Sequence, residues 1–157
     1  MGTRYAIVDE VIVTASKGLF ATKKEALNEL IGLLMRDLSE IEERLPERTE
    51  DLEEAKDDYS SAKEDVGYKK DELVEQIERS TKAGFRLEDD DDVVCLREEL
   101  DEAKYVLEER KAAVELAQED LRVEQVEQVG VLDKLLPALT EYCAICRVEL
   151  EGVTTED

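Results

Sequence analysis

Apolar side chains recur at three- and four-residue steps along most of the chain, a spacing that predicts amphipathic helices. The first such stretch has its apolar positions at Leu27, Leu30, Ile31, Leu34, Leu38, Ile41 and Leu45. Thr22 and Glu25 have the spacing of a capping box, which predicts the start of this helix. Pro46 lacks a backbone N–H, so we expect it to end or sharply bend the helix.

Two later stretches carry heptad repeats, the pattern typical of paired helices. Between residues 47 and 79 the seam positions are Leu52, Tyr59, Val66 and Leu73, with Ala55 and Ala62. Between residues 93 and 128 they are Leu100, Leu107, Val114 and Leu121, with Leu96, Ala103 and Ala117. Two such runs joined by a short break predict an antiparallel hairpin within the chain. Each helix would be roughly 50 Å long at 1.5 Å per residue.

One register of this hairpin sets large side chains against small ones in most layers, which favours close packing. It pairs Leu73–Leu96, Val66–Ala103, Ala62–Leu107, Ala55–Val114 and Leu52–Ala117. Its midpoint falls at Gly84, a residue suited to a turn, and it lets Tyr59 stack on Arg110. The register one heptad along places Leu52 opposite Glu124 and is less favourable.

The two ends of the chain predict a small base. Residues 5–14 are β-branched and apolar and predict a strand, Ser16-Lys17-Gly18 predicts a turn, and Leu19-Phe20 a short return strand. After residue 128 a last helical stripe contains Leu132, Leu135, Leu136, Leu139, Tyr142, Cys143, Cys146 and Leu150. Pro137 either kinks that helix or lies in its first turn.

The predicted fold is mainly α: a long antiparallel coiled-coil hairpin on a base made of a β-hairpin and two further helices. Residues 1–45 form the N-terminal part of the base and residues 46–128 the hairpin, with its tip at about 81–92. Residues 129–151 form a C-terminal helix that packs on the base, and residues 152–157 a polar tail.

The chain holds 43 Asp and Glu against 21 Lys and Arg, a net charge of −22, and residues 37–157 alone carry −23. This charge repels nucleic acids and anionic membranes and attracts basic proteins. No apolar run is long enough for a membrane span or a signal peptide. Three Cys suit a reducing compartment, so we expect a cytoplasmic protein.

Enzymatic chemistry and a cofactor are not expected, because the chain has no His, no Gly-rich phosphate loop and no nucleophile elbow. Cys143 and Cys146 have CxxC spacing, but a structural zinc needs four ligands. Core packing is the favoured role of these two Cys, and a redox or metal role is the alternative.

The predicted tip holds the candidate partner-binding residues Phe85, Arg86, Leu87, Asp89, Asp90, Asp91 and Asp92. Phe and Arg are enriched where partners dock. Alternatively, Phe85 and Leu87 fold back and close the end of the hairpin. The acidic run is a helix start capped by Asp91 or Asp92, or a patch for a basic partner. A cation site is the third alternative, although the run lacks the spaced ligands and central Gly of a calcium loop.

The segment Val13–Leu27 resembles the N-terminal strand–turn–helix motif of small bacteriophage proteins, through Gly18, Phe20, Thr22, Glu25 and Ala26. The resemblance implies a phage origin, and small acidic phage proteins are often anti-CRISPR or anti-restriction inhibitors, some of them DNA mimics. Together with the charge of one sign, the apolar tip and the absence of catalytic groups, this origin favours an inhibitor in the host cytoplasm that blocks a basic, nucleic-acid-processing or defence protein, sterically or by mimicry of nucleic acid. The alternative is a structural coiled-coil adaptor that self-associates, for example as a homodimer.

Overall fold

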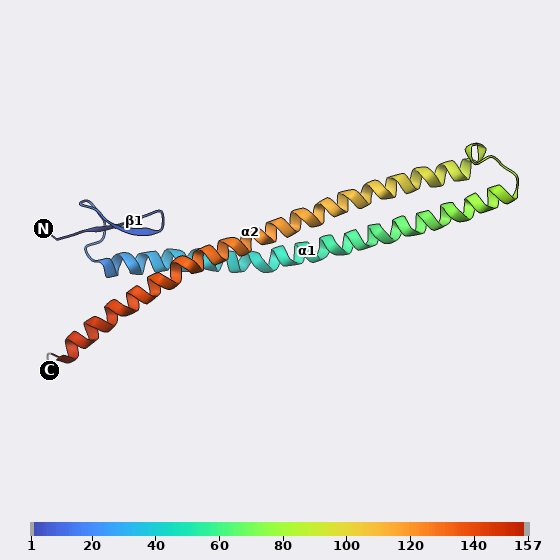
Figure 1. Cartoon of the computed structure of the whole chain (residues 1–157). Helices are drawn as coiled ribbons and strands as arrows, with labels where there is room; N and C mark the ends of the chain where they lie inside the picture. Colours follow the sequence, from blue (N-terminus) through green and yellow to red (C-terminus); the bar gives the residue numbers. More distant parts are fainter. Residues whose placement is uncertain (1, 156–157) are drawn as a thin grey trace. The chain divides into compact units, whose positions relative to one another are not determined.

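The computed structural model describes residues 2–155, with side chains to residue 152. A two-stranded hairpin, β1 (Tyr5–Val8) and β2 (Val11–Thr14), precedes two long helices, α1 (Lys23–Lys82) and α2 (Asp91–Thr155). One turn of 3-10 helix, η1 (Leu87–Asp89), lies between the helices (Figure 1). Contacts divide the chain into a hairpin unit, residues 47–122, and a terminal unit, residues 2–46 with 123–155.

The chain is mainly helical, but the two further helices predicted from the sequence are wrong, because they are parts of α1 and α2. Pro46 lies inside α1 and Pro137 inside α2. A proline in a helix removes one backbone hydrogen bond and distorts the helix locally. Both proline rings are exposed, so the distortion does not disturb a buried core. The predicted polar tail is also helical as far as Thr155, and residues 156–157 lie outside the described part.

The single strand predicted for residues 5–14 is in fact a complete β-hairpin. Asp9 and Glu10 have φ values of 49° and 62° and form the two-residue turn between β1 and β2. This turn lacks the glycine that usually marks it in a sequence. In place of the predicted return strand at Leu19-Phe20, Phe20 alone forms a bridge to the hairpin. Its N–H donates to the Tyr5 carbonyl at 3.1 Å, and the Tyr5 N–H donates to the Phe20 carbonyl at 2.9 Å.

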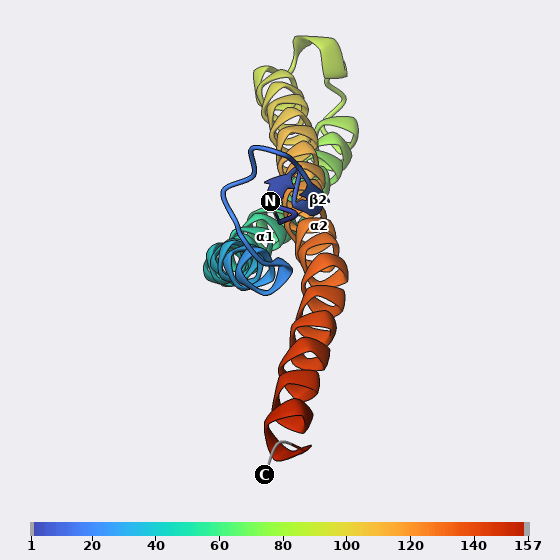
Figure 2. The same cartoon turned by 90° about the vertical axis from the view of Figure 1, so that its left-hand side faces the viewer.

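The core of the terminal unit is built from the predicted first stripe. Its buried side chains come from α1 and α2, and Ile7 and Ile12 of the β-hairpin pack against it. Figures 1 and 2 show the β-hairpin beside the first part of α1. The buried members are Leu27, Leu30, Ile31, Leu34, Leu135 and Ala138. Thr22 caps α1 as predicted, since its Oγ accepts a hydrogen bond from the Glu25 N–H at 3.2 Å.

In the hairpin unit, α1 and α2 pack side by side in a register that agrees with the predicted one. Val66, Leu100 and Ala103 form one buried cluster. Lys69 Nζ lies 3.2 Å from a carboxylate oxygen of Glu99, on the same level of the hairpin. The predicted stacking partner of Tyr59 differs: Lys63 lies over its ring at 5.8 Å.

Within residues 2–155, neither helix has a stretch apolar enough to cross a bilayer.

Gly18 is expected to be essential to the terminal unit. A Cβ at this position would overlap the Tyr5 carbonyl group and lie 2.8 Å from the Tyr5 nitrogen. We predict that Gly18→Ala lowers the free energy of unfolding by about 2 kcal/mol, measured by urea denaturation. The matched control is Gly32→Ala, where a Cβ meets nothing within 4 Å. This control should stabilise α1 by up to about 1 kcal/mol, and equal effects of the two variants would contradict the prediction.

Candidate partner-binding site at the hairpin tip

The tip begins where α1 ends in a left-handed glycine turn. Gly84 lies at the midpoint of the predicted register and has a φ of +79°, a left-handed conformation that glycine adopts readily. The Phe85 N–H donates to the Ser80 carbonyl at 3.0 Å, and the Gly84 N–H donates to the Thr81 carbonyl at 3.2 Å. These two bonds form a Schellman motif, which fixes the direction in which the chain leaves the helix.

Asp90 closes the tip by joining the two helices. Its Oδ1 caps α2 by accepting hydrogen bonds from the N–H groups of Asp92, at 3.0 Å, and Val93, at 3.4 Å. Its Oδ2 accepts hydrogen bonds from the Ser80 hydroxyl and, at 3.3 Å, from the Gln76 amide, both on α1. The predicted cap, Asp91 or Asp92, is therefore wrong by one or two positions.

These hydrogen bonds set the ionisation of Asp90. The Ser80 hydroxyl holds the pKa of the Asp90 carboxyl below its usual value, with help from the Gln76 amide and the N–H groups of Asp92 and Val93. All of these partners favour the charged form. Asp90 is thus a structural carboxylate rather than a group free to meet a ligand.

The apolar side chains at the tip have separate roles. Val93 is fully buried and, with the buried Ser80, closes the end of the hairpin. Phe85 is 66% exposed, so the alternative in which it plugs the hairpin is wrong. Leu87 is half-buried and Arg86 is exposed. The tip therefore presents an aromatic ring to solvent on a backbone held by hydrogen bonds.

The structure brings Phe85 together with the acidic run. They line one open depression of about 500 Å³, together with Gln76, Arg79, Ser80 and Ala83 of α1 and the tip. Asp89, Asp91 and Asp92 are exposed there, whereas Asp90 is engaged in the cap. Arg86 and Leu87 do not line this depression, although both were predicted as contact residues.

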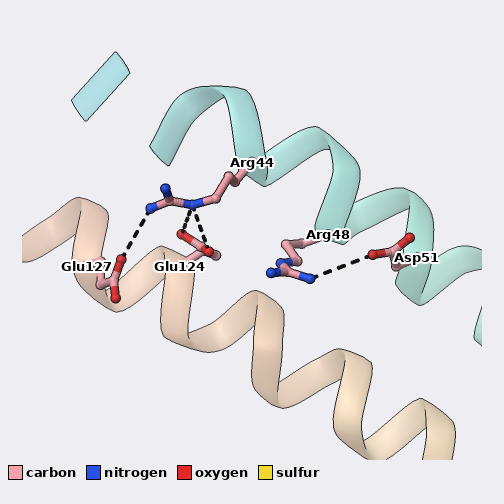
Figure 3. A network of polar contacts seen from close by, with 5 residues as sticks. All are labelled: Arg44, Arg48, Asp51, Glu124 and Glu127. Atoms are coloured by element: carbon pink, nitrogen blue, oxygen red, sulfur yellow. Dashed lines mark hydrogen bonds and ion pairs between the residues drawn. The ribbon is translucent and has the colours of Figure 1, made fainter. Parts of the chain in front are cut away.

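The surface of the hairpin unit is acidic even after its basic side chains have formed ion pairs. Residues 47–122 contain 27 acidic and 13 basic side chains. Arg110 pairs with Asp58 at 3.8 Å across the hairpin, and Arg48 pairs with Asp51 at 3.9 Å along α1 (Figure 3). Most carboxylates in the unit therefore have no basic side chain available to match them.

The three cysteines are free thiols, and Cys143 and Cys146 are not a buried pair. Cys143 is exposed, so its predicted core position is wrong, while Cys146 is half-buried. The negative charge of Glu99 raises the pKa of the exposed Cys95 thiol, which stays protonated at neutral pH. Among the described residues, no three Cys, Asp or Glu side chains are grouped so as to hold a metal ion.

Comparisons of the chain with family models, curated proteins and solved structures gave no match. The phage-type resemblance of Val13–Leu27 stays a prediction from the sequence. Three of its residues have structural roles in the terminal unit: Gly18 packs on Tyr5, Phe20 pairs with Tyr5, and Thr22 caps α1.

Asp90 should give the protein a recognisable dependence of stability on pH. Its pKa is lowered in the folded state, so its contribution is complete above the ordinary value of 3.8 and is lost as the pH falls through the folded value. We predict that Asp90→Ala lowers stability at pH 7 and that its difference from the wild type shrinks as the pH falls below 3.8. Urea denaturation across this range measures the difference. Asp91→Ala, which removes a neighbouring carboxylate outside the cap, is the control, and an equal effect of both variants would assign the change to charge alone.

Proposed function

We propose that this chain is a non-enzymatic binding protein whose acidic helical hairpin engages the basic surface of a nucleic-acid-binding protein. The observation that carries the proposal is the exposed ring of Phe85, two-thirds accessible, beside the carboxylates of Asp89, Asp91 and Asp92. Exposed aromatic anchors surrounded by polar groups are typical of the centres of protein interfaces.

The construction of the tip favours binding because little conformational freedom is left to lose. The Schellman bonds to Ser80 and Thr81 hold Gly84 and Phe85, and Asp90 ties the start of α2 to α1. An anchor that is already ordered loses less entropy when a partner docks. A flexible loop carrying the same residues would bind more weakly.

The charge of the hairpin unit supports a basic partner. A net charge of −14 over residues 47–122 attracts a surface that normally binds phosphates and speeds the encounter with it. Regularly spaced carboxylates along paired helices then act as a steric block or as a mimic of a nucleic-acid duplex. In the phage setting implied by the resemblance of Val13–Leu27, the partner is a host defence or nucleic-acid-processing enzyme.

A structural adaptor is the second candidate. It is favoured by a separate observation, a row of exposed apolar side chains on α2 in the terminal unit, which includes Leu136 and Leu150. An adaptor uses such a row to assemble with other helices. The two functions are compatible in one chain, because the row lies outside the hairpin unit.

The tip assignment is tested by comparing immobilised wild type with Phe85→Ala/Arg86→Ala. We predict that a basic protein from the host extract is retained by the wild type and that its affinity for the tip variant is at least about tenfold lower. Mass spectrometry identifies the protein, and titration measures the affinity. Tyr68→Ala removes an equally exposed aromatic ring elsewhere on the hairpin and should bind as the wild type does. Equal retention by all three proteins would reject the tip as the contact site.

The charge mechanism makes a separate prediction. Raising the salt concentration from about 0.05 to about 0.3 M should weaken binding by at least about tenfold. The added ions screen the carboxylates and reduce the free energy gained when counterions are released on binding. Duplex DNA should compete with the chain for the same partner. An affinity unchanged by salt would remove mimicry of phosphates as its main source while leaving the role of Phe85 intact.

A further inference from the structure

Within the terminal unit, α2 carries two interleaved heptad seams. The first follows alternating steps of four and three residues and faces α1: Glu124, Gln128, Val131, Leu135, Ala138, Tyr142 and Ile145. Leu135 and Ala138 are buried in the core, and Val131, Tyr142 and Ile145 pack against it. Glu124 is 7% exposed and accepts hydrogen bonds from Arg44 Nε at 3.0 and 3.1 Å (Figure 3). This seam has its partner within the chain.

The second seam follows alternating steps of three and four residues, and every position is apolar: Val129, Leu132, Leu136, Leu139, Cys143, Cys146 and Leu150. Its members alternate in exposure. Val129, Leu136, Cys143 and Leu150 are exposed, whereas Leu132, Leu139 and Cys146 are half-buried beside the first seam. Three heptads of this pattern form a surface that a helix covers by knobs-into-holes packing.

We propose that this second seam pairs with the same seam of a second copy of the chain, in an antiparallel arrangement. In one register, Leu139 lies opposite Cys143 of the second copy, Leu136 opposite Cys146, and Leu132 opposite Leu150, while Val129 lies outside these layers. Each layer then sets one exposed residue against one half-buried residue. Two of these layers set a leucine against the smaller side chain of a cysteine, a combination that lets two helices pack closely.

The charges beside the seam favour this copy and this direction. On the side of the seam away from α1 the flanking residues are Asp133, Thr140 and Arg147, all exposed. Antiparallel pairing sets Asp133 of each copy against Arg147 of the other and places Thr140 on the twofold axis. Charges at such flanking positions select the partner and its orientation. Arg147 also forms an exposed ion pair with Glu151 at 3.3 Å, and a pair of this kind is weak enough to exchange.

A parallel pair lacks this complementarity. It would place Cys143 opposite Cys143 of the second copy and would leave Asp133 far from Arg147. It would also place the two Cys143 thiols within reach of a disulfide. The two directions therefore differ in an outcome that can be measured.

Association of two copies is opposed by their charge, since each carries −22. The apolar seam must overcome this repulsion, so added salt should strengthen the dimer. The proposed partner complex of the hairpin tip has the opposite salt dependence. The dimer deepens the adaptor function proposed for this row and does not rest on partner binding by the tip, so Leu136→Glu should leave binding through Phe85 unchanged.

The first experiment measures the mass of the full-length chain by sedimentation equilibrium in about 0.5 M NaCl at concentrations up to about 100 µM. We expect a dimer for the wild type and a monomer for Leu136→Glu. Leu136 is 59% exposed, so the helix content from circular dichroism should not change. Val148→Glu is the matched control, because Val148 is 68% exposed on the opposite face of α2 and this variant should stay dimeric. A monomeric wild type, or a dimer unaffected by Leu136→Glu, would overturn the proposal.

The second experiment tests direction by exchanging charges. Asp133→Arg and Arg147→Asp should each raise the dissociation constant about tenfold, because each replaces two attractive pairs with two repulsive ones. An equimolar mixture of the two variants should recover wild-type affinity as a heterodimer. Independent losses without recovery in the mixture, or a Cys143–Cys143 disulfide on oxidation, would reject the antiparallel arrangement. If a different protein from the host extract occupies the seam of a monomeric chain, the second copy is rejected as its occupant.

Discussion

The pairing of α1 with α2 in a single register is the constraint on which the remaining structure depends. In the hairpin unit it is favoured by side-chain size, because the small side chain of Ala103 leaves room for Val66 beside Leu100. Only this register aligns Asp90 with Ser80 and Gln76, so the carboxylate that caps α2 also binds α1. We call the hydrogen bonds of Asp90 with Ser80 and Gln76 the clasp. A shift of one heptad would move this carboxylate about 10 Å along α1 and leave the tip without its hydrogen bonds.

Basic side chains reinforce this pairing in a chain that has few of them. Arg44 neutralises the buried Glu124 and also lies 3.6 Å from Glu127 (Figure 3). In the hairpin unit, hydrogen bonding to Glu99 raises the pKa of Lys69, which keeps the ammonium group charged in neutral solution. Cations placed between elements hold them together, while the surplus of carboxylates remains at the surface. The basic side chains therefore hold the elements together without removing the negative charge of the surface.

Much of this architecture could be predicted from periodicity and turn chemistry. The heptads, the turn at Gly84 and the cap at Thr22 are local signals, and the structure confirms each of them. The turn at Asp9 and Glu10 was missed because it contains no glycine: Asp tolerates positive φ, but Glu at the second position is not a usual residue there.

Other features depend on distant contacts that no local pattern records. The choice of Asp90 over its neighbours was missed because it is made by Ser80, a residue on the other helix. Cys143 was placed in the core because its stripe was treated as one face. The alternating steps from Val129 to Leu150 show that the stripe is wide enough for two faces, and this signal was present in the sequence.

The clasp at the tip also has a consequence for how the chain folds. Ser80 and Asp90 are separated by only 10 residues, Lys69 and Glu99 by 30, and Lys24 and Glu149 in the terminal unit by 125. Closing a short loop costs less entropy and takes less time than closing a long one. Folding should therefore nucleate at the tip and zip toward the chain ends, so that the last contacts formed are those between the two termini. The same contacts should be the first to open, and the amides near the chain ends should exchange their hydrogens well before those beside the clasp.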